Sequence, residues 1–309
     1  NSLTDSLRTE VLGGAYLNNS HYLSPYGDSF NKDLRLYAEP RATYSVNHYW
    51  TVAAGYAFNR EEMRNSYVTA NARTFLLRRD TQGIYVENRF VLGNRLFINA
   101  GAREEIFKTP FIPGDPTAFS PRPAFAERTE TRTSPKVSAA YQFDSATRLH
   151  ASWGTGIRPP GGADLAFTNN PAVKPEKIQA WDAGIERRFF NDRASLDATF
   201  FDSRYNDLIV GLGGSLAKLS RYFTDNLANA RSEGIELSAR VRPARSVMFT
   251  ANYTWLQTEV LSLDGGSGLV QQYYYAGQPF VRRPKHNASI LANFSHGRLD
   301  ANIFGSIRG

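Results

Sequence analysis

Strict alternation of apolar and polar side chains is the feature of this sequence that most limits its fold. The alternation runs from Arg193 to Asp202, from Ser232 to Val241 and from Ser246 to Trp255. Because successive side chains of a β-strand point to opposite faces, each segment is predicted to be a strand with one apolar and one polar face. Such strands fit either an antiparallel sheet with one face in water or a membrane barrel with lipid outside and water inside.

Tight turns recur along the chain, and their first residues lie 46 to 53 residues apart. The turns are Asn47-His48, Gly93-Asn94, Ser145-Ala146, Asn191-Asp192, Ala244-Arg245 and His296-Gly297. Long polar loops are predicted at about 60–80, 104–134, 157–177, 207–230 and 258–284, where Gly, Pro, Asn and Ser cluster. Two strands per turn give about twelve strands, and Leu7 to Tyr16 is a candidate thirteenth. Short turns at one rim and long loops at the other are typical of outer-membrane barrels.

Two soluble folds compete with the barrel. A period near 50 also occurs in kelch-type propellers, but a propeller blade has four short strands and each period here holds two long ones. In a soluble sandwich the apolar faces would form the core. Mean hydropathy is only −0.43, and no run of about 20 apolar residues is present, which excludes a membrane-spanning helix but not a membrane barrel.

Aromatic residues on the apolar faces lie at two heights. Near the tight turns are Trp50, Phe143, Phe189, Phe249 and Phe294, and towards the long loops are Phe58, Trp153, Trp181, Tyr253 and Trp255. Two membrane interfaces select two aromatic belts, because these rings prefer the headgroup zone. Charged residues are nearly absent between the two heights, with Arg187 as the exception close to a turn. This favours lipid over a protein core.

The net charge of +7 and the absence of cysteine limit the chemistry. A basic chain can bind an acidic ligand or nucleic acid, but here Arg and Lys are spread along the chain, which favours a lumen and loops lined with arginine over a nucleic-acid partner. Without cysteine there is no disulfide framework, thiolate metal site or cysteine nucleophile.

No enzyme signature survives inspection. Ser215-x-x-Lys218 and Thr224-Asp225-Asn226 approach an acyl-enzyme pattern, but the Lys-Thr-Gly partner is missing. Glu61-Glu62 and Glu104-Glu105 are adjacent, so on a strand the two carboxylates of each pair face opposite ways. The five histidines are scattered. We therefore predict no enzyme, no metal site and no cofactor.

Several short motifs, in order along the chain, resemble the barrel of TonB-dependent outer-membrane receptors. They are Trp153-Gly-Thr-Gly-Ile-Arg-Pro-Pro160, Asn170-Pro-Ala-Val-Lys-Pro-Glu-Lys177 with Trp181-Asp-Ala-Gly-Ile-Glu186, Phe200-Phe201, Tyr205-Asn-Asp-Leu-Ile209, Asn229, Ser232-Glu-Gly-Ile-Glu236, Tyr253-Thr-Trp-Leu256 and Arg283-Pro-Lys-His286. Each motif alone is short, but together they cover about Gly101 to Ala301.

The resemblance implies an all-β, antiparallel transmembrane barrel in the outer membrane of a Gram-negative cell. Receptors of this kind have a 22-stranded barrel whose lumen is closed by a plug domain. Residues 1–309 are therefore expected to be one β-barrel domain, a fragment without the plug, the TonB box, the early strands and the final strands. The implied function is uptake of a scarce chelate, such as a ferric siderophore, haem or cobalamin, with energy from TonB. A passive channel or an adhesin is the alternative.

The resemblance also implies where partners bind. Outer-membrane lipid and lipopolysaccharide are expected outside the barrel, and ligand contacts are expected at the long-loop tips and the upper lumen. An aromatic and arginine-rich apex suits a planar or anionic chelate, and an aromatic rim at the level of the headgroups or lipopolysaccharide is the alternative. The candidate ligand-binding residues are Phe167, Asn169, Asn170, Tyr273, Tyr274, Tyr275, Phe280, Arg282 and Arg283.

Overall fold

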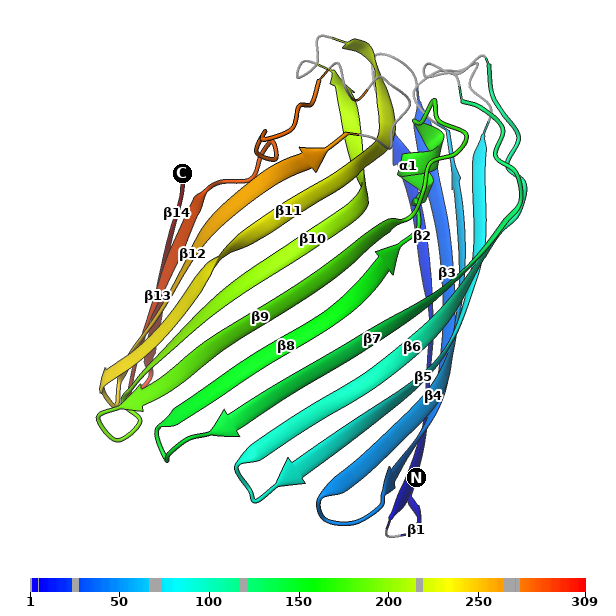
Figure 1. Cartoon of the computed structure of the whole chain (residues 1–309). Helices are drawn as coiled ribbons and strands as arrows, with labels where there is room; N and C mark the ends of the chain where they lie inside the picture. Colours follow the sequence, from blue (N-terminus) through cyan, green and yellow to red (C-terminus); the bar gives the residue numbers. More distant parts are fainter. Residues whose placement is uncertain are drawn as a thin grey trace.

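The chain forms one large antiparallel sheet that follows the order of the sequence. The computed structural model describes residues 2–4, 6–23, 28–66, 74–116, 122–214, 219–263, 270 and 273–309, without the side chains of 2–4 and 212–223. Within these ranges fourteen strands pair in the order β1 to β14, each with its neighbours in the sequence (Figure 1). This confirms the predicted all-β antiparallel architecture.

The strands are long and tilted, and the described part of the chain contains one short helix, α1 (Gly162–Ala166). No helix among the described residues is long and apolar enough to cross a bilayer. The strands are β1 (Ser2–Thr4), β2 (Leu7–Tyr22), β3 (Ser29–Ser45), β4 (Trp50–Asn65), β5 (Phe75–Leu92), β6 (Leu96–Thr109), β7 (Arg128–Gln142), β8 (Thr147–Arg158), β9 (Glu176–Phe189), β10 (Ala194–Gly214), β11 (Leu219–Ala244), β12 (Val247–Ser262), β13 (His286–His296) and β14 (Leu299–Arg308).

The six predicted tight turns all join paired strands at one end of the sheet. Side chains fix some of them: Asn47 Oδ1 accepts the backbone N–H of Tyr49 at 2.9 Å, and Asp144 Oδ1 accepts those of Ala146 and Thr147, both at 2.7 Å. These backbone hydrogen bonds hold the pKa of the Asp144 carboxyl below its usual value. The candidate thirteenth strand exists as β2, and the three-residue β1 precedes it.

The long polar loop predicted at 207–230 is wrong. β10 continues to Gly214 and β11 begins at Leu219, so the hairpin extends far beyond the apolar part of the sheet. Ser215 to Lys218, which contains the Ser-x-x-Lys pattern, lies outside the described residues. The alternation disappears here because both faces of the hairpin leave the apolar zone, although the backbone ladder continues. Asp207 has φ +55 within β10, a backbone conformation that favours Asn and Asp among non-glycine residues.

Strand register joins the apolar faces into one continuous surface. Ala239, Ala251, Ile290 and Gly305 are successive cross-strand partners from β11 to β14. In this surface Phe249 is 38% exposed and Ile290 is 51% exposed. These side chains would be buried in a soluble sandwich, so the exposed apolar band supports contact with lipid.

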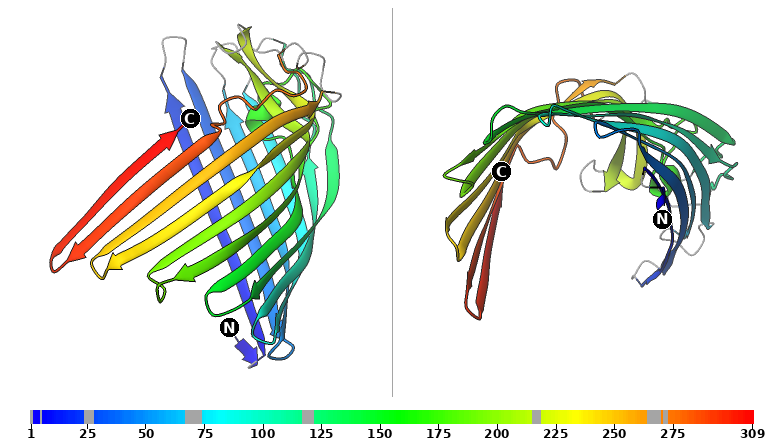
Figure 2. Two further views of the ribbon diagram at one scale, coloured as in Figure 1. Left: turned by 60° about the vertical axis from the view of Figure 1, so that its left-hand side comes forward. Right: turned by 90° about the horizontal axis from the view of Figure 1, so that it is seen from below.

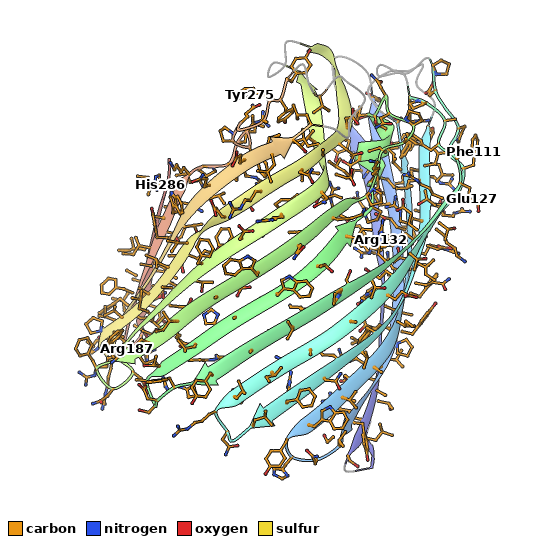
Figure 3. The ribbon with its side chains drawn as sticks, in the orientation of Figure 1. Phe111, Glu127, Arg132, Arg187, Tyr275 and His286 are labelled. Carbon is orange, nitrogen blue, oxygen red and sulfur yellow. The ribbon has the colours of Figure 1, made fainter. Side chains whose placement is uncertain are left out.

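Polar groups in the apolar surface are partnered or lie near its edge. The indole Nε1 of Trp50 donates to Asn88 Oδ1 at 3.0 Å, which satisfies an amide on the apolar face of β5. Arg187 lies at the tight-turn end (Figure 3), with its guanidinium 5.6 Å from the ring of Phe189. A long side chain at this position keeps its charge at the interface while its stem covers apolar surface.

The opposite face of the sheet carries hydrogen-bonded polar side chains. Tyr85 donates its hydroxyl to Glu39 at 2.7 Å, and Arg41 pairs with Glu10 at 2.8 Å. Tyr85 needs a glycine on the neighbouring strand, because a Cβ at Gly55 would lie 2.5 Å from its hydroxyl oxygen. Thus apolar and polar residues are segregated on the two faces, as the alternation predicts.

The sheet curves into an open arc when it is seen from below (Figure 2). The first and last strands, β1 and β14, do not pair with each other. Unpaired backbone groups are costly in hydrocarbon, so this curved sheet, here called the wall, needs hydrogen-bond partners along both of its edge strands. The structure is therefore a partial barrel.

Candidate functional site

The end of the wall opposite the tight turns, here called the loop end, contains two small hydrophobic cores. The first core is built from three separate parts of the chain and is closed to solvent, with Phe75 and Leu77 at 1% and 0% exposure. Its members are Phe75 and Leu77 of β5, Ile112 and Phe125 of the β6–β7 connection, and Leu165, Ala166 and Val173 of the β8–β9 connection. Met63 of β4 and Phe167 pack against it.

The second core lies between the extended hairpin and the β12–β13 connection. Leu227 of β11, Val260 of β12, Val270 and Tyr274 are buried together. Leu208, Val210, Leu263, Tyr273 and Phe280 pack against them. Both cores fix loops onto strands, so the loop end has a defined surface on which side chains can be displayed.

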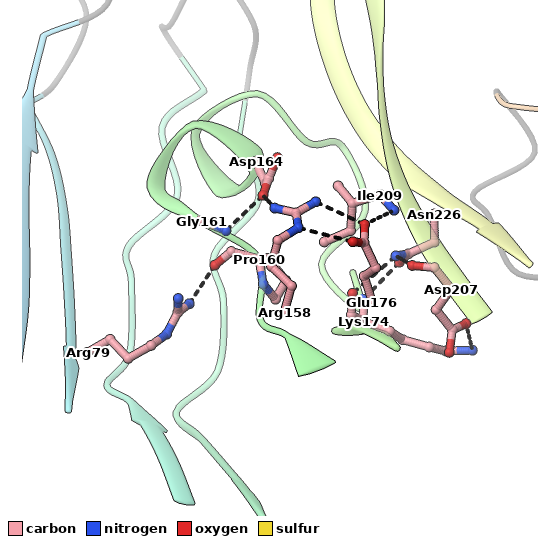
Figure 4. A network of polar contacts seen from close by, with 10 residues as sticks. All are labelled: Arg79, Arg158, Pro160, Gly161, Asp164, Lys174, Glu176, Asp207, Ile209 and Asn226. Carbon is pink, nitrogen blue, oxygen red and sulfur yellow. Dashed lines mark hydrogen bonds and ion pairs between the residues drawn. The ribbon is translucent and has the colours of Figure 1, made fainter. Parts of the chain in front are cut away.

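Arg158, the last residue of β8, holds the β8–β9 connection (159–175) in place. Its Nη1 lies 2.8 Å from Asp164 Oδ2 of α1, and its Nη2 lies 3.1 Å from Glu176 Oε2 at the start of β9 (Figure 4). The same Glu176 oxygen accepts the N–H of Ile209 in β10 at 3.2 Å. Burial alone would lower the pKa of Arg158, but its hydrogen bonds and ion pairs with Glu176 and Asp164 outweigh burial and raise that pKa. The guanidinium therefore joins three elements as a permanent cation.

Arg79 of β5 fixes the connection from the other side. The side chain is 5% exposed, its Nη2 donates to the carbonyl oxygen of Pro160 at 2.5 Å, and its Nε donates to Thr109 Oγ1 at 3.1 Å. Burial lowers the pKa of this guanidinium. Among the described residues no carboxylate lies within ion-pair distance of it, so neutral oxygens compensate for much of its desolvation.

Asn226 of β11 fastens the connection to the extended hairpin. Its Oδ1 accepts the backbone N–H of Lys174 at 2.8 Å, and its Nδ2 donates to the carbonyl oxygens of Lys174 at 3.1 Å and Asp207 at 2.8 Å. The Asp207 carboxylate lies 3.4 Å from Lys174 Nζ. Asn226, which is 1% exposed, thus serves as hydrogen-bond partner for three backbone groups, the N–H and C=O of Lys174 and the C=O of Asp207.

Together these contacts make residues 159–175 a bridge across the concave side of the sheet. Its helix α1 contacts both β5 and β11, which are six positions apart in the sheet. A parallel bridge between Thr168 and Thr224 and the hydrogen bond from Asn170 Nδ2 to Asp225 Oδ1 at 2.9 Å complete the attachment to β11. We call residues 159–175 the loop bridge.

Three of the predicted ligand residues belong to the loop bridge. Phe167 packs against the first core, and its carbonyl oxygen accepts the N–H of Thr224 at 2.9 Å. Asn170 is used structurally, because its side chain bonds Asp225 and also accepts the N–H of Ala172 at 2.8 Å. Asn169 is half-buried. Phe167 and Asn170 are thus held by contacts within the loop end, and binding of a ligand by these three residues stays a prediction.

The other six predicted residues lie in the β12–β13 connection around the second core. Tyr274 is buried and Tyr273 and Phe280 pack against that core, with the Phe280 ring 6.3 Å from Tyr205. Tyr275 is 65% exposed and lies at the loop end (Figure 3). Arg282 and Arg283 are also exposed. The nine residues therefore form two sets around two cores, and within the second set the groups open to a ligand are Tyr275, Arg282 and Arg283.

The residues that organise the site were missed by sequence reasoning. Asn226 and Arg158 stood within motifs, but their roles depend on backbone atoms of distant segments, which leave no periodic signal in the sequence. Arg79 follows the strand alternation, since 75, 77 and 79 are buried while 76 and 78 are exposed. Its burial could have been expected from that pattern, but its partner Pro160 could not.

The described residues offer no clear metal centre: no group of three or more His, Cys, Asp or Glu side chains within them could hold an ion. The arrangement offers hydrogen-bond donors, aromatic rings and arginine cations, which recognise a ligand and do not by themselves make or break bonds.

Comparison with known proteins identifies this architecture. Residues 2–308 match a family model described as TonB dependent receptor-like, beta-barrel. A curated relative, the metal-pseudopaline receptor CntO of Pseudomonas aeruginosa, is 19% identical over 170 residues, which is 55% of this chain and 22% of the relative.

Solved structures agree on the fold. The copper transporter OprC has a TM-score of 0.77 at 16% identity, over 99% of this chain and 50% of that one. The ferric yersiniabactin uptake receptor FyuA from Yersinia pestis has a TM-score of 0.69 at 16% identity, over 94% of this chain and 45% of that one. The chain thus spans about half the length of these structures and about a fifth of the curated relative.

Proposed function

Since the chain belongs to the TonB-dependent receptor family, as part of its β-barrel, we propose that the protein imports a metal chelate across the outer membrane with energy delivered by TonB. Members of this family are outer-membrane β-barrels that act as transporters and not as enzymes. The single observation that carries the proposal is the match to the family model over almost the whole chain. A plug domain and a TonB box, which couple such a barrel to TonB, are proposed for the complete protein.

The class of ligand rests on two kinds of support. The relatives named above are described as receptors or transporters for metal-pseudopaline, ferric yersiniabactin and copper. At the loop end, Tyr275, Arg282 and Arg283 are exposed on a connection held by the second core. An exposed aromatic ring and two exposed guanidinium groups on the same connection suit an anionic chelate, and a ferric siderophore is the first candidate, followed by haem and cobalamin.

An uptake assay tests the proposal. The full-length receptor is expressed in cells that lack their own chelate receptors, and uptake of labelled ferric siderophores, haem, cobalamin and copper is compared with and without TonB. We expect uptake of one ligand class that disappears when TonB is removed. Uptake that continues without TonB would instead indicate a passive channel.

Two variants separate ligand binding from assembly. Arg282→Ala/Arg283→Ala should weaken binding of an anionic chelate by about tenfold or more, since a hydrogen bond to a charged group contributes about 1.5–3 kcal/mol. Arg245→Ala, in a tight turn at the other end of the sheet, is the matched control. If the double variant binds every ligand of the panel as tightly as the control, these arginines are not part of the site.

A further inference from the structure

A pocket of about 780 Å³ lies on β2 to β4, on the concave side of the wall. Its face is given by a row of successive cross-strand partners from β2 to β5, which are Tyr16, Arg35, Glu61 and Arg79. Directly opposite residues point to the same side of a sheet, so the first three share the face of Arg79, which binds the loop bridge. Met63 also lines the pocket and packs against the first core. The pocket therefore adjoins the loop end of the concave face.

Glu61 is a carboxylate of this pocket that binds no other group. It lies between Arg35 and Arg79 in the row, but neither guanidinium is within ion-pair distance of it. Arg35 donates its Nε to Asn59 Oδ1 at 2.8 Å, and Arg79 is held by the loop bridge. The charge of Glu61 acts on Arg79 only through space. Arg35 and Glu61 are thus both available to a ligand.

Asp33 is the second carboxylate that lines the pocket, two residues before Arg35 on the same face. Its Oδ2 accepts hydrogen bonds from Asn18 Nδ2 at 3.1 Å and from Asn31 Nδ2 at 2.6 Å, which fix the carboxylate in place. Its Oδ1 is buried and has no hydrogen-bond partner among the described residues. Neutral amides do not cancel its charge, so a cationic group beside it would be stabilised.

Two tyrosine rings form the apolar part of the pocket. Tyr16 is 59% exposed and Tyr37 is 48% exposed. The ring of Tyr37 lies across the neighbouring strand, because a Cβ at Gly14 would be 2.7 Å from Tyr37 Cε1. The absence of a side chain at Gly14 thus fixes this ring as a side of the pocket. Aromatic faces take up apolar groups and also attract an ammonium group.

Two further charges near the pocket are engaged elsewhere. Glu62 borders the pocket, but Arg64 and Arg78 bind its carboxylate on the opposite face, each at 2.9 Å. Arg79 is 5% exposed and donates to the loop bridge. The charges of the concave face that line the pocket without an ion pair are therefore Arg35, Asp33 and Glu61.

A ligand group with a single charge does not match this set. An anion would pair with Arg35 but would be repelled by Asp33 and Glu61, and a cation would leave Arg35 without a partner. A group that carries an ammonium and a carboxylate on one carbon atom offers both signs within one pocket. The α-amino acid group has this chemistry.

We propose that the pocket on β2 to β4 binds a zwitterionic α-amino acid group of the imported chelate. Arg35 receives the carboxylate, for which its planar guanidinium is suited, and Glu61 with Asp33 receives the ammonium. Tyr16 and Tyr37 cover the carbon atoms next to these charges. This inference rests on the proposed function, because the chelate carries the group into the barrel.

The test uses the purified full-length receptor in nanodiscs and three small probes without metal. The probes are L-phenylalanine, N-acetyl-L-phenylalanine, in which the amine is blocked, and L-phenylalaninamide, in which the carboxylate is blocked. Their affinities are measured by saturation-transfer NMR titration. We expect the wild type to bind L-phenylalanine at least tenfold more tightly than either blocked form, since each blocked form loses a charge-assisted hydrogen bond.

Two variants assign the two charges. Glu61→Gln should weaken binding of L-phenylalanine by about tenfold and reduce its advantage over the N-acetyl form. Arg35→Gln should weaken it by a similar factor and reduce its advantage over the amide. Glu87→Gln is the matched control, because Glu87 is an exposed carboxylate of the same face, on β5 towards the tight turns and outside the pocket.

The proposal is overturned if the wild type binds the three probes equally or does not bind L-phenylalanine. An equal loss in Glu87→Gln would overturn it as well. TonB-dependent uptake of a chelate by a receptor that fails this test would leave the proposed function in place and remove only the pocket. Binding of L-phenylalanine with the expected variant pattern, but without TonB-dependent uptake of any chelate, would instead contradict the proposed function.

Discussion

Removing the Asn226 amide tests whether the loop bridge is held by this one side chain. Asn226→Ala deletes three hydrogen bonds, from Lys174 N–H and to the carbonyl oxygens of Lys174 and Asp207, at 2.8, 3.1 and 2.8 Å. Only the two bonds with Lys174 join the bridge to β11, because Asp207 lies in β10. A hydrogen bond contributes about 1 kcal/mol net, so the free energy of opening the bridge should fall by about 2 kcal/mol. Because about 1.4 kcal/mol corresponds to a factor of ten, the opening equilibrium should rise by about 30-fold.

Hydrogen–deuterium exchange of the full-length receptor measures this opening directly. Exchange at the amides of Ala172, Val173 and Lys174 should accelerate by about 30-fold, while amides in the middle of β10, such as that of Ala198, should keep their protection. The sheet itself should remain folded, because the deleted bonds lie outside its ladder.

Asn169→Ala provides the control, since it removes the same amide from a neighbouring position in the bridge and no hydrogen bond is described for that side chain. The reasoning is refuted if Asn226→Ala leaves exchange across 172–174 unchanged. It is equally refuted if Asn169→Ala accelerates that exchange as much.

Three further perturbations test other parts of the structure. Ala251→Arg places a charge in the apolar band at a cost of about 2–4 kcal/mol and should block stable insertion, whereas Asn252→Arg on the polar face should be tolerated. Similar folded fractions of the two variants in outer membranes would contradict the assignment of the two faces. Asp207→Val should destabilise the extended hairpin by about 1–2 kcal/mol because of its φ of +55, while Asp207→Gly should not, as measured by proteolysis of the hairpin. The pKa of Asp144 is lowered in the folded state, so its stabilisation of the turn is present above its unfolded pKa near ~4 and is lost as pH falls through the lower folded value. The protection factor of the Thr147 amide, which is its exchange rate relative to the intrinsic rate at the same pH, should therefore fall with acidity in the wild type and lose this dependence in Asp144→Asn.

The wall of the barrel could be predicted from the sequence because its physical cause is local. Each residue between Ser246 and Trp255 faces either lipid or the opposite side, and this choice is visible in the side chain itself. The turns were predictable for the same reason, as with Asn47 and Asp144, whose side chains bond to backbone groups two or three residues away.

The loop end was less predictable because its causes are distant in the chain. Arg79 bonds Pro160, 81 residues away, and Asn226 bonds Lys174, 52 residues away. The strands beyond the apolar band lose their alternation, so the ladder of β10 and β11 was mistaken for a loop. Whether Tyr275, Arg282 and Arg283 bind a ligand remains a prediction.

The loop bridge has a mechanical consequence for the wall. A sheet joined only through neighbouring strands can flatten or roll with little resistance, because each pair tolerates a range of twist. The loop bridge connects β5 and β11 on the concave side and restrains the curvature of the sheet, since any widening of the arc must stretch the contacts of Arg79 and Asn226. The curvature of this segment is therefore fixed at the loop end, and loosening the loop bridge would change the curvature of the sheet there.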